Sequence, residues 1–257
     1  MLQSIQLFRY LLLGFGVSLI VQAVDSPSAI AAPQTSDYCN SQLDDGWLNR
    51  TAICRFPSGN RFEGSLRKHQ RQGRGVFIYA NGTRCEGQFQ NNLLNGRGVC
   101  TFPSGNRYEG EFRNNEKRGH GVFIYADRTR CEGFFSNDAL NGFGRCTFSS
   151  GNRYEGYFVN NVRQGQGTFI YANGIRCSGQ FRADALNGMG ACAYPNGDRY
   201  EGAFQNNQPN GSGVYVSANG TRSQGIWRNG SLWQVKPSQL RPNLRPRMQP
   251  LQRRSPR

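Results

Sequence analysis

Apolar and polar residues alternate along short segments of this chain, and glycine-containing turns separate one segment from the next. Tyr108, Gly110 and Phe112 fall on one face of such a segment. Glu109 and Glu111 fall on the other face, as expected for a β-strand with one apolar side. A second segment follows each of the first kind and is rich in β-branched and aromatic residues, as in the run GVFIY. The pattern therefore predicts pairs of short antiparallel strands.

This pair of segments recurs every 23 residues, so each repeat is one β-hairpin whose places can be numbered 1 to 23. Complete units begin at Phe62, Cys85, Tyr108, Cys131, Tyr154, Cys177 and Tyr200. Places 3, 12 and 14 are glycine in these units, as in Gly110, Gly119 and Gly121. Residues 32–61 contain a degenerate unit from residue 39, and a half unit occupies residues 223–233. Because the terminal units of a solenoid have only one neighbour, both segments are predicted to be caps.

Asn-Gly or Ser-Gly follows the second strand of most units. Examples are Asn81-Gly82, Ser104-Gly105, Asn173-Gly174 and Asn219-Gly220. Asn-Gly favours the two-residue type I′ turn, which needs positive φ angles, and we predict that turn here. Arg128 replaces the glycine in one unit, where a left-handed backbone would cost about 1 kcal/mol. The predicted fold is all-β: an elongated single-layer antiparallel β-meander of tandem 23-residue hairpins.

The repeated motif resembles the MORN repeat. Y-x-G-x-F/W, followed about seven residues later by G-x-G, occurs in register through the seven units of residues 62–222. The resemblance implies an elongated, curved, single-layer sheet that serves as an interaction or membrane-associated platform. The MORN family usually has tryptophan at place 5. Here that place holds Phe89, Phe112, Phe135, Phe158, Phe181 and Phe204, with Leu66 before them and Trp227 after them.

The eight cysteines follow a doubled period of 46 residues. They occupy positions 39, 54, 85, 100, 131, 146, 177 and 192, which are places 1 and 16 of every second unit. If each hairpin turns near places 8 and 9, these two places lie directly opposite each other, within reach of a disulfide. We therefore predict the pairs Cys39–Cys54, Cys85–Cys100, Cys131–Cys146 and Cys177–Cys192.

Two alternatives for the cysteines are weaker. Pairing Cys54 with Cys85 would join units that are not adjacent, at two or more strand spacings, beyond the reach of a disulfide. A metal site is disfavoured because the chain has no C-x-x-C motif, and its two histidines, His69 and His120, occupy different places in their units. Each predicted disulfide would contribute about 3 kcal/mol in the chain-entropy model.

The first 31 residues are predicted to be a signal peptide with its cleavage region. Arg9 precedes a mostly apolar run, Tyr10–Ala23, that is too short to span a bilayer comfortably. Small residues offer cleavage sites after Ala23 and after Ala31, and an uncleaved anchor is the alternative. Export to the periplasm, the cell envelope or the medium would place the cysteines where disulfides persist.

The formal net charge is +15, which favours anionic surfaces or polymers. Place 23 is arginine throughout the array and place 2 is usually glutamate, on the same face. We favour a structural ion-pair ladder between neighbouring strands over a cationic binding ladder. Ser178 and Gln224 replace the glutamate, so Arg176 and Arg222 are less compensated and become candidate binding residues.

Place 10 alternates in the same double period as the cysteines. It is leucine in the cysteine units and basic in the others, with Leu94, Leu140 and Leu186 against Arg71, Lys117 and Arg163. One hypothesis is that successive hairpins carry apolar and then basic tips, with the three basic residues as candidate binding groups. The alternative, which we slightly favour for the leucines, is local packing on their own turns.

Residues 234–257 form a basic tail with five prolines, one lysine, six arginines and no acidic residue. This composition predicts an extended, disordered segment. Lys236, Arg241, Arg245 and Arg247 are candidate contacts to an anionic surface, and a solubilising end without a partner is equally open.

No catalytic constellation, phosphate-binding loop, cofactor motif or metal site is recognisable, so we do not expect an enzyme. The favoured function is an extracytoplasmic scaffold that binds a protein or an envelope component. The alternative is direct binding of anionic lipid or polysaccharide through the basic tips and tail. Self-association through edge strands is a third option, and nucleic acid is a poor candidate for an exported, disulfide-bearing chain.

Overall fold

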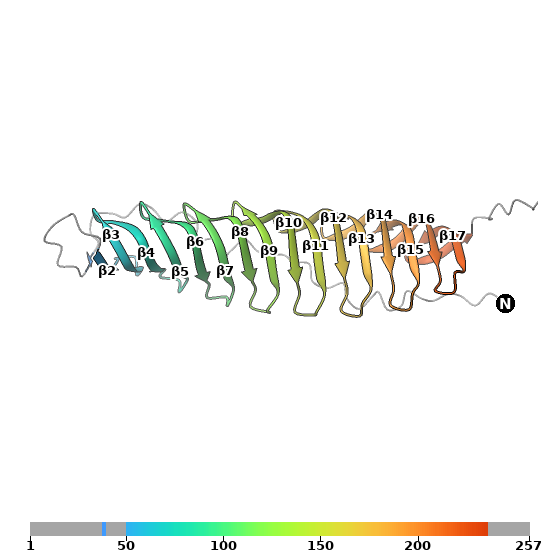
Figure 1. Ribbon diagram of the computed structural model, residues 1–257, viewed down its shortest axis with the longest axis horizontal. Helices are drawn as coiled ribbons and strands as arrows, with labels where there is room; N and C mark the ends of the chain where they lie inside the picture. The colour runs from blue at the N-terminus through green and yellow to red at the C-terminus, as the bar shows by residue number, and fades with distance from the viewer. Residues whose placement is uncertain (1–37, 40–49, 236–257) are drawn as a thin grey trace, which may run out of the picture.

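The computed structural model describes residues 38–39 and 50–235, and it confirms the predicted fold: one antiparallel sheet in which each strand pairs with the next. The strands follow one another along the long axis of the molecule (Figure 1). They are β1 (Tyr38–Cys39), β2 (Arg50–Arg55), β3 (Arg61–Arg67), β4 (Gln70–Ile78), β5 (Arg84–Gln90), β6 (Leu93–Thr101), β7 (Arg107–Arg113), β8 (Glu116–Ile124), β9 (Arg130–Ser136), β10 (Ala139–Thr147), β11 (Arg153–Val159), β12 (Val162–Ile170), β13 (Arg176–Arg182), β14 (Ala185–Ala193), β15 (Arg199–Gln205), β16 (Gln208–Val216), β17 (Arg222–Arg228) and β18 (Ser231–Val235). The predicted signal peptide and nearly all of the basic tail lie outside the described residues.

The type I′ turn occurs in a different connection from the predicted one. Within each unit, places 7 and 8 form the tight turn, as Asn91 and Asn92 show with φ angles of 49° and 69°. The Asn-Gly pair instead lies in the longer connection between units. There only the glycine has a positive φ, for example 89° at Gly82, whose amide donates to the carbonyl of Tyr79 at 2.8 Å. The prediction of a type I′ turn at Asn-Gly was therefore wrong. The residues at places 7 and 8 form that turn, and they are two asparagines in most units but Lys68-His69 or Ala183-Asp184 in others.

A bulge in the second strand of each hairpin corrects the register after this early turn. In β3 and β4, Leu66 lies opposite Arg71 and Gly64 lies opposite Gly75, so three residues face Ser65 alone. The glycine at place 12 has positive φ in every unit of the array, from 76° to 111°, which permits the bulge. Because the bulge adds two residues, places 1 and 16 still lie opposite each other, although the turn is one place earlier than predicted.

One face of the sheet, which we call the aromatic face, holds the core. It carries places 1, 5, 10 and 16, and the rings at place 1 are fully buried in Phe62, Tyr108, Tyr154 and Tyr200. Each ring lies over the glycines at places 3 and 14. A Cβ added to Gly121 would approach the Tyr108 hydroxyl oxygen to 2.3 Å, so glycine is needed to admit the ring. The opposite face, which we call the polar face, carries places 2, 4, 13, 15 and 23.

Three of the four predicted disulfides are present, and all six of their cysteines are buried on the aromatic face: Cys85–Cys100, Cys131–Cys146 and Cys177–Cys192. Cys54 is also buried and lies opposite Cys39 in the β1–β2 register. The side chain of Cys39 is outside the described part of the chain, so the fourth disulfide remains a prediction.

Asparagine or aspartate side chains at place 8 join successive units. The carboxamide oxygen of Asn115 accepts a hydrogen bond from the backbone amide of Leu94, 21 residues earlier, at 2.7 Å. Equivalent bonds join Asn92 to Arg71, Asp138 to Lys117, Asn161 to Leu140, Asp184 to Arg163 and Asn207 to Leu186. These bonds fix each hairpin against the preceding one, in addition to the sheet ladder.

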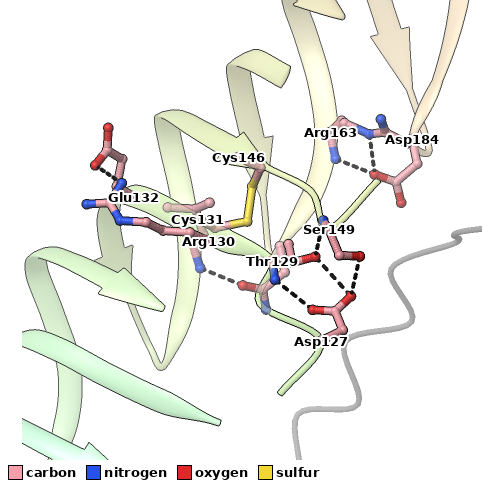
Figure 2. The surroundings of a disulfide bond; sticks show 11 residues. Asp127, Thr129, Arg130, Cys131, Glu132, Cys146, Ser149, Arg163 and Asp184 are labelled. Carbon is pink, nitrogen blue, oxygen red and sulfur yellow. Dashed lines mark hydrogen bonds and ion pairs between the residues drawn. A yellow bond between two sulfur atoms is a disulfide. The ribbon is translucent and has the colours of Figure 1, made fainter. Parts of the chain in front are cut away.

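The predicted left-handed backbone at Arg128 is present, with a φ of 72°. Its turn is held by the Asp127 carboxylate, which accepts hydrogen bonds from the Thr129 amide at 2.8 Å and the Ser149 hydroxyl at 3.4 Å. Figure 2 shows this network beside the Cys131–Cys146 disulfide. The network stabilises a turn in which an arginine occupies the usual glycine place.

Candidate functional site

The basic residues predicted at the hairpin tips are buried instead. Arg71 and Lys117 are only 8% and 3% exposed, and the side chain of Arg163 is 11% exposed. They lie on the aromatic face because the early turn places them opposite place 5, inside the hairpin, and not beside the tip. Leu94, Leu140 and Leu186 are also buried, which agrees with the favoured alternative of packing and not with exposed apolar tips. None of the three basic residues is positioned to bind a large partner.

Each buried cation lies among three aromatic rings. The Arg71 guanidinium is 4.6 Å from the centroid of Phe77 and 5.8 Å from that of Phe62. Arg163 also forms an ion pair with Asp184 at 3.0 Å, which Figure 2 shows. In the cysteine units, the smaller disulfide leaves room that leucine fills. The doubled period is therefore a matter of packing: a ring with a cation alternates with a disulfide and a leucine.

The exposed arginines of the polar face form ion pairs in the N-terminal half of the array. These pairs join place 23 to place 2 of the same strand: Arg61–Glu63, Arg84–Glu86, Arg107–Glu109 and Arg130–Glu132. The predicted ladder between neighbouring strands is not formed by these place-23 arginines. In the described chain a cross-strand pairing forms through Arg145 at place 15, which lies within 3.6 Å of Glu132 and 3.3 Å of Glu155. These side chains are about half exposed, so each pair adds little stability.

The arginines at place 23 lack such ion pairs in the C-terminal half of the array. Arg176, Arg199 and Arg222 are exposed, and no carboxylate of the described chain lies within 4.0 Å of them. Ser178 and Gln224 stand where the other units have glutamate. Arg153 and Arg199 also form no ion pair within 4.0 Å in the described chain, although Glu155 and Glu201 lie in their strands, so the missing glutamates alone do not explain the unpaired arginines. Of the nine candidate binding residues, Arg176 and Arg222 are exposed on this face. Lys236, Arg241, Arg245 and Arg247 are outside the described residues.

Two grooves run along the polar face. The larger, the N-terminal groove, has a volume of about 1230 Å³ and extends over β3 to β10, between carboxylates such as Glu86 and guanidinium groups such as Arg97. The smaller, the C-terminal groove, has a volume of about 700 Å³ and extends over β13 to β17. Arg176, Arg199 and Arg222 line it.

Exposed aromatic residues lie on the polar face from β9 to β11, at the end of the N-terminal groove, which Phe143 lines. Phe134, Phe143 and Tyr157 are 45%, 53% and 51% exposed. His120 lies opposite Phe134 with ring centroids 5.8 Å apart, and Phe143 lies opposite Tyr157 at the same separation. These exposed rings were not predicted from the sequence, because the phenylalanine and tyrosine residues were expected to fill the core face of the sheet. The available signal was their place in the unit: Phe134 and Tyr157 occupy place 4 and Phe143 occupies place 13, and both places lie on the polar face.

The tyrosine hydroxyls of the aromatic face have structural contacts. Those of Tyr108, Tyr154 and Tyr200 each donate to a backbone carbonyl three residues later, at 3.1 Å. Burial raises the pKa of Tyr154 and of Tyr200 to about 12, so both hydroxyls stay protonated near neutrality. They do not serve as general bases under those conditions.

Asp198 is also structural. It is buried, and the hydroxyl of Tyr215 donates to its carboxylate. This hydrogen bond lowers the pKa of Asp198 below its usual range, against the opposing effect of burial. The second carboxylate oxygen accepts from the Ala218 amide at 2.8 Å, so the group closes a connection between units.

Within the described residues, no group of three or more histidine, cysteine, aspartate or glutamate side chains is arranged to hold a metal ion. Nor does that part of the chain contain a helix that is long and apolar enough to cross a membrane. The described surface includes an extended polar face lined by charged side chains.

The model of the MORN repeat matches this chain in seven consecutive segments: 62–84, 85–107, 108–130, 131–153, 154–176, 177–199 and 200–222. The chain belongs to the MORN repeat family. MORN repeats form generally non-catalytic scaffolds for interaction with proteins or membranes. In this MORN array, the aromatic face is filled by its own side chains, and the polar face is exposed to solvent.

A comparison with curated proteins gave no match for this MORN protein. Among solved structures, it is similar to the SAS-4 (dCPAP) TCP domain of Drosophila melanogaster in complex with a proline-rich motif of Ana2 (dSTIL). The TM-score is 0.40 at 12% identity, over 60% of this chain and 84% of that chain. It is also similar to the G-box domain of the microcephaly protein CPAP, with a TM-score of 0.40 at 12% identity, over 70% of this chain and 100% of that chain. Similarities at this level carry no argument about function.

Proposed function

We propose that this MORN protein is an exported, non-catalytic scaffold that binds an extended protein or envelope component along its polar face. The observation that carries the proposal is the contrast between the two faces of the sheet. The aromatic face is filled by rings, disulfides, leucines and buried cations. The polar face is open, hollowed by two grooves, and lined by charged groups and exposed rings.

The shape of the polar face favours an extended partner over a compact one. Its two grooves lie in succession along the ribbon, over β3 to β10 and over β13 to β17. A segment that follows the long axis would contact the mixed charges of the first groove, the exposed rings, and then the arginines of the second groove. A compact partner would contact only a few units.

The buried disulfides support an extracytoplasmic location. Three pairs are formed between directly opposed places of the sheet, and such bonds persist in oxidising compartments. The apolar run Tyr10–Ala23 supports the same proposal from the sequence, as a signal peptide cleaved after Ala23 or Ala31 or kept as an anchor.

Capture of envelope components by the full chain tests the scaffold function. We would compare the wild type with a polar-face variant, Phe143→Ser together with Tyr157→Ser, and with the control Val159→Ser. Val159 is 51% exposed, close to the 53% and 51% of the two rings, and lies on the same face of the sheet but outside the ring pair, beside a hairpin turn. We expect the wild type and the control to retain a component that the polar-face variant loses.

Two results would count against the proposal. Equal capture by all three proteins would show that the rings of the polar face do not take part in binding. Failure of the wild type to retain anything beyond a denatured control would contradict the scaffold function itself. Location is tested separately by thiol labelling in fractionated cells, where cytoplasmic protein with reactive cysteines would contradict export.

The second candidate function is direct binding of an anionic polymer or lipid. The buried positions of Arg71, Lys117 and Arg163 remove them as contacts, so the hypothesis now depends on the C-terminal arginine row and the tail. Arg176 and Arg222 favour it, since both are exposed and lack an acidic partner in the described chain. Self-association through edge strands stays a prediction.

A further inference from the structure

Positive charge on the polar face is concentrated in the C-terminal groove. Among the residues that line this groove, the charged ones are Arg176, Arg199, Arg222 and Glu201. Three guanidinium groups therefore face a single carboxylate. In the N-terminal half, by contrast, the arginines at the same place of the unit are neutralised by glutamates in their own strands.

The three arginines form a regular row along the ribbon. They are the first residues of β13, β15 and β17, and β14 and β16 lie between these strands. The register places Ala193 between Arg176 and Arg199, and Val216 between Arg199 and Arg222. The backbone positions of successive arginines are thus two strand spacings apart, or about 9.6 Å. This separation is close to the length of two linked pyranose rings.

The rest of the groove suits the uncharged part of such a polymer. The arginine row forms one side of the groove, and the opposite side includes Met189 and Ile226. Ala191 and Val214 lie between these two sides. Met189 is 65% exposed, so its side chain is available for contact. Ser178 and Gln224 add hydrogen-bonding groups without adding negative charge.

We propose that the C-terminal groove binds a linear anionic polysaccharide that lies along the ribbon with acidic groups against Arg176, Arg199 and Arg222. A twofold chain of linked sugars directs every second acidic group to the same side, at an interval that matches the arginine row. The sugar rings then lie on Ala191, Val214 and Met189. The inference rests on the proposed function, because it names the partner class for part of the polar face.

The groove favours a polysaccharide over the other polyanions. A flat bilayer would meet the arginine side chains but would leave the hollow between the two sides unfilled. A single-stranded nucleic acid binds by stacking its bases on exposed rings. The only aromatic residue that lines the C-terminal groove is Tyr200, and its side chain is fully buried on the aromatic face.

Binding of a purified oligogalacturonate to the full-length oxidised protein tests this inference by calorimetry. The charge-removing variant is Arg176→Gln with Arg199→Gln and Arg222→Gln. The matched control is Arg84→Gln with Arg107→Gln and Arg130→Gln, which removes the same formal charge from the same place of three other units. The basic tail is kept in every protein, so its contribution is constant. Thermal unfolding and a non-reducing disulfide map establish that each variant is folded.

We expect the C-terminal triple variant to bind about tenfold more weakly, from roughly a two- to threefold loss for each exposed ion pair. Its binding should also depend less on salt concentration than that of the wild type. The control variant should bind within about twofold of the wild type. The fully methyl-esterified oligosaccharide should not bind, because its acidic groups are uncharged.

Several results would overturn the inference. Equal weakening in both triple variants would show that only net charge matters. The C-terminal variant could instead lose binding to vesicles with 30% phosphatidylglycerol, or to a single-stranded oligonucleotide, while it still binds the oligosaccharide. That result would assign the arginine row to another polyanion. The wild type could fail to bind oligogalacturonate and still capture a partner through Phe143 and Tyr157. That result would reject this inference alone and would leave the scaffold function supported.

Discussion

The disulfide between Cys131 and Cys146 joins the middle hairpin of the array, β9–β10. Replacing both cysteines by alanine should loosen that hairpin and leave its neighbours closed. The two residues pair directly in the register and both are buried on the aromatic face. Their loss therefore removes a covalent constraint from one repeat without disturbing the polar face.

The size of the effect follows from the loop that the bond closes. The cysteines are 15 residues apart, for which the chain-entropy model gives about 3 kcal/mol. Because each repeat of a linear array contacts only its neighbours, most of this loss should appear as local opening of the β9–β10 hairpin. Every 1.4 kcal/mol changes an equilibrium about tenfold, so amide exchange there should accelerate by about two orders of magnitude.

Hydrogen exchange with peptide-level mass spectrometry measures this opening in the full chain. The β5–β6 and β13–β14 hairpins keep their own disulfides in the same variant and act as internal controls. Unchanged exchange in β9–β10 would show that the disulfide does not limit its opening. Equal acceleration in all three hairpins would contradict the nearest-neighbour reasoning, since the array would then unfold as one cooperative unit.

Three further predictions concern the aromatic face. Gly121→Ala should lower the free energy of unfolding by about 1–3 kcal/mol in urea titration, because the added Cβ would lie 2.3 Å from the Tyr108 hydroxyl oxygen. Arg163→Ala should lower the thermal midpoint more than Arg163→Leu, because leucine fills the space that the buried arginine leaves and alanine does not. Burial raises the pKa of Tyr154 and Tyr200 to about 12, above the ordinary value of 10.0, so their contribution to stability is complete below pH 10 and is lost as the pH rises towards 12. Circular dichroism together with tyrosinate absorbance follows that loss.

Each of these predictions has a control. In a Tyr108→Leu background the cost of Gly121→Ala should shrink, and an unchanged cost would show that the ring is not the obstacle. Leu140 and Leu186 occupy the same place as Arg163 and are both buried, so a leucine variant as unstable as the alanine variant would refute the packing argument. Ionisation of every tyrosine near pH 10 with the fold intact would contradict the assigned burial.

The repeat period and the strand alternation already determined the architecture. A 23-residue unit with one apolar face per strand cannot bury that face alone, so successive hairpins must pair in one long sheet. The opposition of places 1 and 16 also followed from spacing, and Cys85–Cys100 and its two counterparts have that register. These features depend on local alternation and on a strict repeat, and both can be recognised directly in the amino-acid sequence.

The assignment of single side chains to faces and contacts depended on the three-dimensional structure. A turn one place earlier than expected and a bulge opposite Ser65 keep the same distant pairing but move place 10 from the tip into the core, where Arg71 is buried. The neighbours Phe134 and Phe135 are 45% and 2% exposed, because adjacent residues of a strand point to opposite faces. Sequence spacing gives only the combined length of the turn and the bulge. The folded backbone shows how long each of them is. The position of the turn then decides which charged side chains are buried and which remain exposed for binding.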